Sequence, residues 1–215
     1  MYLVVARSQP LTLADALGAA VQATLRCRDE YARDARYAET FAAWAALQRK
    51  VTLRARDSQW QALLAAFDVA VADRSLCLAL PARRRDTLEA LLRRLQVYSA
   101  DEADLPAGEL HPTSNAPVMV LAADRQMSVG KLMAQVSHAA AMLADAAWFD
   151  TGLWRQAGYP IGLAQADRGT WDSFAARGDG VLVRDAGLTE IAAGTETVLA
   201  LADTAPGLTA LTPTR

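Results

Sequence analysis

Two long segments of this chain repeat the same order of strand and helix patterns. Short β-type runs alternate with amphipathic stretches rich in alanine and leucine in residues 1–100, and the same order returns after residue 117. Single positions match as well, because residues 57–60 (Asp-Ser-Gln-Trp) align with residues 168–171 (Arg-Gly-Thr-Trp). Any two segments rich in alanine and leucine share some pattern, but the common order of elements favours a repeat. We therefore expect two copies of one α/β unit.

Hydrophobic periodicity predicts the elements of each copy. In the first copy, we expect strands at residues 2–6, 51–56, 69–72 and 76–80, and helices at about residues 12–28, 38–48, from 57, and 84–97. In the second copy, we expect strands at residues 118–122, 160–165, 181–185 and 197–202, and helices from 128, at 146–156 and at 169–177. Helical crossovers between strands predict a partly parallel sheet with helices on both faces, and the turn after Asp73 adds an antiparallel hairpin.

Residues 101–117 separate the two copies and have the composition of a linker, with prolines, acidic residues and small polar side chains. The expected domains are therefore residues 1–100 and residues 118–215. His111 lies in this linker and is expected to be solvated.

The composition is typical of a globular chain, with 53% hydrophobic and 21% charged residues. No apolar run approaches the roughly 20 residues that span a bilayer, and residues 1–7 do not resemble a signal peptide. We expect a cytoplasmic protein without a membrane partner. Cys27 and Cys77 lie in apolar contexts without CxxC spacing, which favours buried, reduced thiols over a disulfide or a metal site.

A formal net charge of −2 argues against a general nucleic-acid coat protein, because phosphate binding depends on clustered Lys and Arg. One basic cluster stands out in the first copy, formed by residues 83–85 (Arg-Arg-Arg) together with Arg93 and Arg94. It is either a local basic surface or the solvated face of a helix.

Scarce polar side chains share one helical face in the second copy. Lys131 is one of only two lysines in the chain, and His138 is one of only two histidines. At about 100° per residue, Lys131, Gln135 and His138 fall within roughly 60° of one another on the helix predicted from residue 128. With Thr12 set opposite Ser128, the first copy has Asp15, Ala19 and Gln22 at these positions. Only the second copy therefore offers a cation, an amide and an imidazole.

A loop rich in glycine and threonine follows Asp185, at the end of a predicted strand of the second copy. The first copy has only Arg74 and Ser75 at this place. A carboxylate followed by hydroxyls and free backbone N–H groups is a common way to bind a ligand at the carboxyl end of a strand. The same residue types also satisfy local turns, which is the alternative. The candidate residues of the loop are Gly187, Thr189, Gly194, Thr195 and Thr197.

The helix motif and the loop motif lie about 50 residues apart. The first motif contains Gly130-Lys131-x-x-x-Gln135-x-x-His138, and the second runs from Asp185-Ala-Gly187-x-Thr189 to Gly194-Thr195-x-Thr197. Together they closely resemble the motifs of the type II peptidyl-tRNA hydrolases, and the resemblance covers roughly residues 117–203. It implies a mixed four-stranded sheet flanked by helices in each copy. Because relatives usually form homodimers, it also implies an intrachain pseudo-dimer with a degenerate first copy.

The resemblance implies a hydrolase that cleaves the ester bond of peptidyl-tRNA, without a metal or an organic cofactor. Asp185 would orient or activate a water, while Thr189 and Thr197 would offer hydroxyls to the ester. Lys131, near the positive end of its helix, would meet a phosphate or the oxyanion. His138 would carry a proton, bond within the site or be structural. The expected substrate-binding residues are Gly130, Gln135, Gly187, Gly194 and Thr195.

Three loop positions depart from the family pattern. Leu188 stands where a basic residue is common, Glu190 where glutamine is common, and Ala193 where proline is usual. Residues 111–215 also contain 7 Lys and Arg against 10 Asp and Glu, whereas RNA binding favours positive charge. The alternative functions are a non-catalytic binding or regulatory module that retains the fold, and an enzyme acting on a different small amide or ester.

Overall fold

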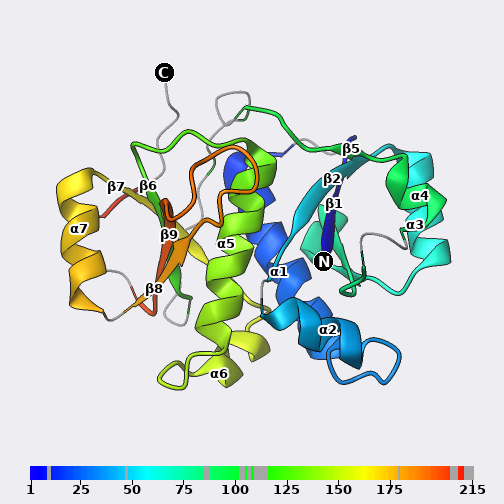
Figure 1. Ribbon diagram of the computed structural model, residues 1–215, viewed down its shortest axis with the longest axis horizontal. Helices are drawn as coiled ribbons and strands as arrows, with labels where there is room; N and C mark the ends of the chain where they lie inside the picture. Colours follow the sequence, from blue (N-terminus) through cyan, green and yellow to red (C-terminus); the bar gives the residue numbers. More distant parts are fainter. Residues whose placement is uncertain are drawn as a thin grey trace.

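The structure is a computed structural model that describes residues 1–8, 11–46, 48–84, 88–101, 105, 108, 116–178, 180–203 and 208–210. Two mixed five-stranded sheets lie on opposite sides of the molecule, and two long helices pack between them (Figure 1). The prediction of an α/β fold is confirmed.

The first half forms a sheet with the strand order β3-β4-β1-β2-β5. Its strands are β1 (Tyr2–Ala6), β2 (Val51–Ala55), β3 (Ala70–Val71), β4 (Cys77–Leu80) and β5 (Gln96–Val97). β1 pairs in parallel with β2 and antiparallel with β4. Its helices are α1 (Leu13–Tyr31), α2 (Ala38–Ala45), α3 (Asp57–Ala66) and α4 (Ala90–Arg93), and the short turn η1 (Asp73–Ser75) joins β3 to β4.

The second half has the equivalent order, β8-β9-β6-β7-β10. Its strands are β6 (Val118–Ala122), β7 (Gly162–Ala166), β8 (Gly180–Arg184), β9 (Glu196–Leu201) and β10 (Thr209–Ala210). β6 pairs in parallel with β7 and antiparallel with β9, as β1 does with β2 and β4. Its helices are α5 (Val129–Ala144), α6 (Thr151–Gln156) and α7 (Arg168–Arg177). The two halves therefore repeat one topology.

The two central helices begin in the same way. The hydroxyl of Thr12 accepts the backbone N–H of Asp15 at 3.0 Å, and the hydroxyl of Ser128 accepts that of Lys131 at 3.2 Å. These N-caps satisfy backbone donors that the first turn of a helix leaves free. They also align α1 with α5 residue by residue, so Asp15 is the structural equivalent of Lys131.

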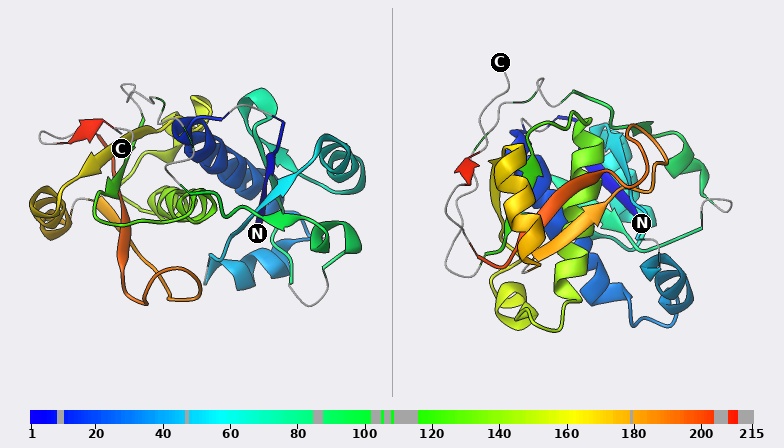
Figure 2. Two further views of the ribbon diagram at one scale, coloured as in Figure 1. Left: turned by 90° about the horizontal axis from the view of Figure 1, so that it is seen from above. Right: turned by 60° about the vertical axis from the view of Figure 1, so that its left-hand side comes forward.

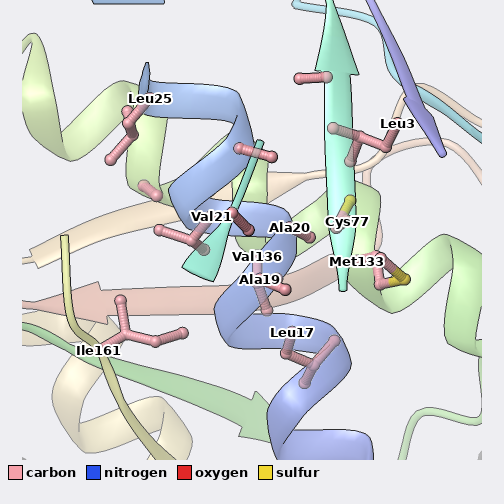
Figure 3. Packing of buried hydrophobic residues seen from close by; sticks show 14 of the residues in the cluster. Leu3, Leu17, Ala19, Ala20, Val21, Leu25, Cys77, Met133, Val136 and Ile161 are labelled. Carbon is pink, nitrogen blue, oxygen red and sulfur yellow. The ribbon is translucent and has the colours of Figure 1, made fainter. Parts of the chain in front are cut away.

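Alternation along the central strands divides the core into layers. Leu3 and Val5 of β1 join a large cluster between the sheets that contains residues of both α1 and α5 (Figure 3). Tyr2 and Val4 face the other way and pack with Trp60 of α3. Trp171 of α7 covers the outer face of the second sheet in the same manner. In both views of Figure 2, α1 and α5 lie side by side between the sheets.

Polar contacts also join the two halves. Arg28 of α1 donates to the Ala141 carbonyl at 2.8 Å and pairs with Asp145 at 2.5 Å, at the end of α5. Arg155 pairs with Asp29 at 2.8 Å. The halves are thus joined by a shared apolar core with ion pairs at its margin.

Three predicted details are wrong. Each sheet has five strands rather than four, because β5 and β10 add a short edge strand beside β2 and β7. The helix predicted at residues 84–97 is reduced to α4 in the described part, since residues 96–97 pair with β2 instead. The helix predicted at 146–156 begins only after Asp150, whose side chain caps it by accepting the Gly152 N–H at 2.9 Å.

Other predictions concern the linker, the cysteines and membrane spans. Residues 102–104, 106–107 and 109–115 of the predicted linker, including His111, lie outside the described residues. Cys27 and Cys77 are free and buried, as predicted. No helix within the described ranges has the length and apolarity that crossing a bilayer requires.

Candidate functional site

Four predicted site residues converge beside the first turns of α5. The Lys131 ammonium forms an ion pair with the Asp185 carboxylate and donates to the Thr189 hydroxyl at 3.0 Å. The Gln135 amide, one turn further along α5, donates to the same Asp185 oxygen at 2.5 Å. The side chains of Lys131 and Asp185 are only 11% and 5% exposed. A cation and an amide are therefore held on one shielded carboxylate.

Thr197 extends this network into the core. Its hydroxyl donates to the Gln135 amide oxygen at 3.0 Å, and the residue has no exposed surface. The prediction that Thr197 offers its hydroxyl directly to a reacting ester is therefore corrected. Thr197 instead bonds to the Gln135 amide, which in turn bonds to Asp185.

The backbone of the predicted loop wraps around Asp185. The Gly187 N–H donates to the second carboxylate oxygen at 2.8 Å, and the Asp185 carbonyl accepts the Gly194 N–H at 2.8 Å. The Asp185 N–H donates to the Thr195 carbonyl, also at 2.8 Å. Gly187 has φ +72°, and a Cβ there would come within 2.7 Å of Ala193, so this turn requires glycine. The predicted glycines and Thr195 thus shape the loop that presents Asp185.

Gly130 has a different environment from the one expected of a substrate-binding residue. It is buried, and a Cβ at this position would lie 2.0 Å from the Tyr98 carbonyl oxygen. The Thr52 hydroxyl donates to the Gly130 carbonyl at 2.9 Å, and the Val129 N–H donates to the Ala100 carbonyl. The first half therefore clamps the start of α5, and Gly130 is needed for close packing.

Glu190 closes the same helix end from the other side. Its carboxylate accepts the Ser128 backbone N–H at 2.8 Å and the Ser128 hydroxyl at 2.6 Å. This places a negative charge at the positive end of the α5 dipole. The expected anion site at this helix start is thus filled by the protein's own carboxylate, and Lys131 faces Asp185 instead of open solvent.

His138 lies outside the hydrogen-bonded network. It is half-buried on α5, about one turn beyond Gln135, and no hydrogen bond reaches its imidazole from the described residues. Burial and the nearby charge of Lys50 lower its pKa from 6.5 to about 4, while the charge of Asp185 opposes this shift. The imidazole is therefore neutral near pH 7.

The equivalent place in the first half has an ion pair of opposite polarity. Asp15 accepts from Arg74 at 2.7 Å, where the second half has a cation on the helix and a carboxylate on the loop. Gln22 and Arg26 donate to Asp73 at 3.1 and 2.7 Å. These contacts occupy the short turn after β3. In the described residues of the first half, this place has neither a long loop nor a buried amide like that of Gln135.

The predicted basic cluster belongs to a separate region. Arg83 and Arg84 line a cavity of about 800 Å³ in the first half. Arg83 pairs with Glu89 at 2.7 Å and lies over the Phe67 ring, so its charge is largely balanced. Arg93 and Arg94 are exposed on and after α4, and Arg85 is outside the described residues. None of the residues lining this cavity belongs to the Asp185 network.

Lys50, the other lysine of the chain, was not among the predicted site residues. Its charge acts on His138 across the boundary between the halves. A sequence pattern has no signal for this charge effect, because the two residues belong to different halves.

Comparison with known proteins assigns no family. No protein-family model matches the chain, and no curated protein matches it. Within the described residues, no group of three or more His, Cys, Asp and Glu side chains is placed to hold a metal ion.

Proposed function

We propose that this chain is a type II peptidyl-tRNA hydrolase-like enzyme that cleaves the ester bond of peptidyl-tRNA or of an N-substituted aminoacyl-tRNA. The second half carries the reaction, and the first half is its degenerate partner in an intrachain pseudo-dimer. The observation that carries the proposal is the shielded network of Lys131, Gln135, Thr197 and Asp185, which the first half lacks.

The proposed reaction uses protein groups alone, and the partner is the tRNA. Asp185 would hold the attacking water with the lone pairs that Lys131, Gln135 and the Gly187 N–H leave free. Lys131 is adjacent to both Asp185 and the exposed Thr189, so it would stabilise negative charge that develops on the ester carbonyl. Thr189 would contact the ester oxygen. Gln135 and Thr197 would keep the carboxylate in place.

A second function is favoured by two contacts. Glu190 occupies the start of α5, and Asp185 neutralises Lys131, so both reduce the attraction of this surface for RNA phosphates. A non-catalytic module that binds an acylated tRNA or a related ligand without turnover would have these properties.

A release assay with radiolabelled peptidyl-tRNA separates the two functions. Wild type should release free tRNA, and Asp185→Asn should reduce the rate at least about 100-fold, because the amide no longer holds the water as an anion does. Asp73→Asn, at the corresponding turn of the first half, is the matched control and should retain the wild-type rate. Binding without release by wild type would establish the module instead, and equal release by wild type and Asp185→Asn would refute the hydrolase assignment.

A further inference from the structure

The two halves of the chain carry net charges of opposite sign. Residues 1–100 contain 15 Lys and Arg against 10 Asp and Glu, whereas residues 101–215 contain 7 against 14. The half that holds the Asp185 network is therefore acidic, and the other half is basic. Because RNA binding depends on Lys and Arg that neutralise phosphates, this asymmetry favours the first half as the partner of an RNA.

Three arginines of the first half gather where β1 and β2 end. Arg54 lies in β2 and pairs with Val5 of β1, while Arg56 follows two residues later, directly after β2. Arg7 directly follows β1, and its N–H donates to the Ala55 carbonyl at 2.8 Å. The carboxyl ends of neighbouring parallel strands share one edge of a sheet, which is a common place for ligands. The strand register thus brings the three arginines to one edge.

The charges of these arginines are not balanced within the described part of the chain. No ion pair with a described residue reaches any of the three guanidinium groups. Arg54 is half-buried and lies 4.8 Å from the centre of the Tyr98 ring, and its Nε is buried without a hydrogen-bond partner. Arg7 and Arg56 are exposed, and the neighbouring acid Asp57 accepts from a serine hydroxyl at 2.5 Å instead. The three side chains can therefore meet an external anion.

Strand β2 connects this edge to the candidate site. Thr52 faces the same side of β2 as Arg54, and its hydroxyl donates to the carbonyl of Gly130, the residue before Lys131. At about 3.3 Å per residue, Arg54 and Arg56 lie roughly 7 and 13 Å along the chain from Thr52. In Figure 1, β2 ends on the same side of the molecule as the loop after β8. A ligand at the Asp185 network can thus extend over the arginines.

The second half has uncharged residues at two of the equivalent positions. Ala123 is the counterpart of Arg7, because its N–H donates to the Ala166 carbonyl at 3.1 Å in the same way. Gln165 is the counterpart of Arg54 in the register of the central parallel strands. The shared topology therefore does not require arginine at either position.

The third position shows a residue that is unfavourable for the fold. Arg56 is the N-cap of α3, as Asp167 is the N-cap of α7, and the Asp167 carboxylate accepts the Thr170 N–H at 2.8 Å. An arginine side chain has no acceptor for such a bond, and its charge lies at the positive end of the helix dipole. Helix stability favours an acidic or small polar residue here, so Arg56 has no explanation in the packing or capping of the fold.

We propose that Arg7, Arg54 and Arg56 form an arginine surface that binds the RNA backbone beside the Asp185 network. Guanidinium groups form paired hydrogen bonds with phosphate oxygens, and successive phosphates suit a row of such groups. The inference rests on the proposed function, which identifies the RNA as an acylated tRNA. The degenerate half then supplies the positive charge that the catalytic half lacks.

Filter binding of deacylated tRNA across a salt series tests the arginine surface without a hydrolysis assay. Arg54→Met and Arg56→Asn should each weaken binding severalfold at low salt and reduce the slope of log K against log salt by about 1. Arg33→Gln, which removes an exposed arginine beyond the far end of α1, is the matched control and should retain the wild-type slope. Arg56→Asn should also keep or raise the melting temperature, because asparagine can cap α3, so unfolding would not explain its weaker binding.

Two outcomes would overturn the arginine surface: no measurable binding of tRNA by wild type, or the same affinity and salt slope in Arg54→Met, Arg56→Asn and Arg33→Gln. In the release assay, Arg54→Met and Arg56→Asn should raise KM for peptidyl-tRNA severalfold with little change in kcat. If wild type binds tRNA through these arginines but cleaves no peptidyl-tRNA, the proposed function fails while the arginine surface stands. If wild type cleaves peptidyl-tRNA and both variants keep its KM and its tRNA affinity, the arginine surface fails while the proposed function stands.

Discussion

Asp15 on α1 and Lys131 on α5 occupy the same helical position of the two halves and carry opposite charges. Each forms an ion pair with the segment that leaves the strand beside it, Asp15 with Arg74 and Lys131 with Asp185. The polarity of this contact is therefore reversed between the halves. Only the second ion pair is joined to a buried amide, because the first half has Ala19 where the second half has Gln135.

Replacing Gln135 by alanine makes the second half resemble the first at this position. The Thr197 hydroxyl and one Asp185 oxygen then lose a buried partner, which should lower the free energy of unfolding by about 1 to 3 kcal/mol. The release rate should fall at least about tenfold, because Asp185 is no longer oriented. Urea unfolding and the release assay measure these effects. In the first half, Gln22→Ala removes a more exposed amide contact, to Asp73, and should cost less than about 1 kcal/mol. Equal losses of stability in the two variants would contradict the proposed role of the buried network.

Gly130→Ala tests the clamp between the first half and the start of α5. The added methyl group would lie 2.0 Å from the Tyr98 carbonyl oxygen, so the backbone must shift, and we expect a loss of about 3 kcal/mol or more. In Gly169→Ala on α7, the nearest atom would be 3.7 Å away, and stability should stay the same or increase by up to about 1 kcal/mol. Thermal unfolding compares the two variants. An unchanged melting temperature in Gly130→Ala would show that the backbone near the Tyr98 carbonyl can shift at little cost in stability.

Glu190→Gln tests whether the loop carboxylate repels RNA. The amide keeps an acceptor for Ser128 but loses the charge at the helix end, which should lower stability by about 0.3 to 1 kcal/mol. Affinity for tRNA should increase severalfold at low salt, and the gain should decline as salt is added. Filter binding across a salt series measures this. Asp172→Asn on α7 changes the net charge by the same amount and should increase the affinity for tRNA less. An equal increase in both variants would show that net charge alone explains the effect.

Protonation of His138 should destabilise the fold. Its folded pKa of about 4 lies below the unfolded value of 6.5, so the unfolded chain binds more protons between these limits. Its contribution to stability is complete above pH 6.5 and is lost as the pH falls toward 4. We expect about 1 to 3 kcal/mol, reduced by partial exposure of the ring. Urea unfolding at pH 4.5 and 7 should show a smaller pH dependence for His138→Asn.

Lys50→Met gives an independent check on the same group. Removing the lysine charge should raise the pKa of His138 toward its ordinary value, as followed by NMR titration. Arg168→Gln should leave the His138 titration unchanged. An unchanged pKa in Lys50→Met would place the two side chains too far apart to interact.

The elements that sequence reasoning predicted best are those with strong local signals. The runs at residues 2–6 and 118–122 coincide with β1 and β6, because central strands buried on both faces are continuous apolar segments. The helix starts expected at about residues 12 and 128 coincide with those of α1 and α5, where Thr12 and Ser128 cap the first turns. β5 and β10 were missed, since two-residue edge strands depend on a distant strand that accepts them.

The candidate site was likewise predicted where its signals are local and missed where it depends on distant residues. Sequence reasoning selected Lys131, Gln135 and Asp185, and the structure brings these three side chains together. It did not predict that Asp185 neutralises Lys131, or that Glu190 fills the helix start. Both contacts join residues more than 50 positions apart, and their pairing depends on how the long loop folds over α5.

The sequence by itself determined the repeated order of elements and the polar face of α5, because hydrophobic periodicity is a property of neighbouring residues. Only the tertiary structure decided which of these polar groups are shielded and which charges balance one another, as Asp185 balances Lys131. The physical reason is that burial and charge pairing arise when the layers pack. A side chain's hydration and its counter-ion are then set by elements far away in the chain.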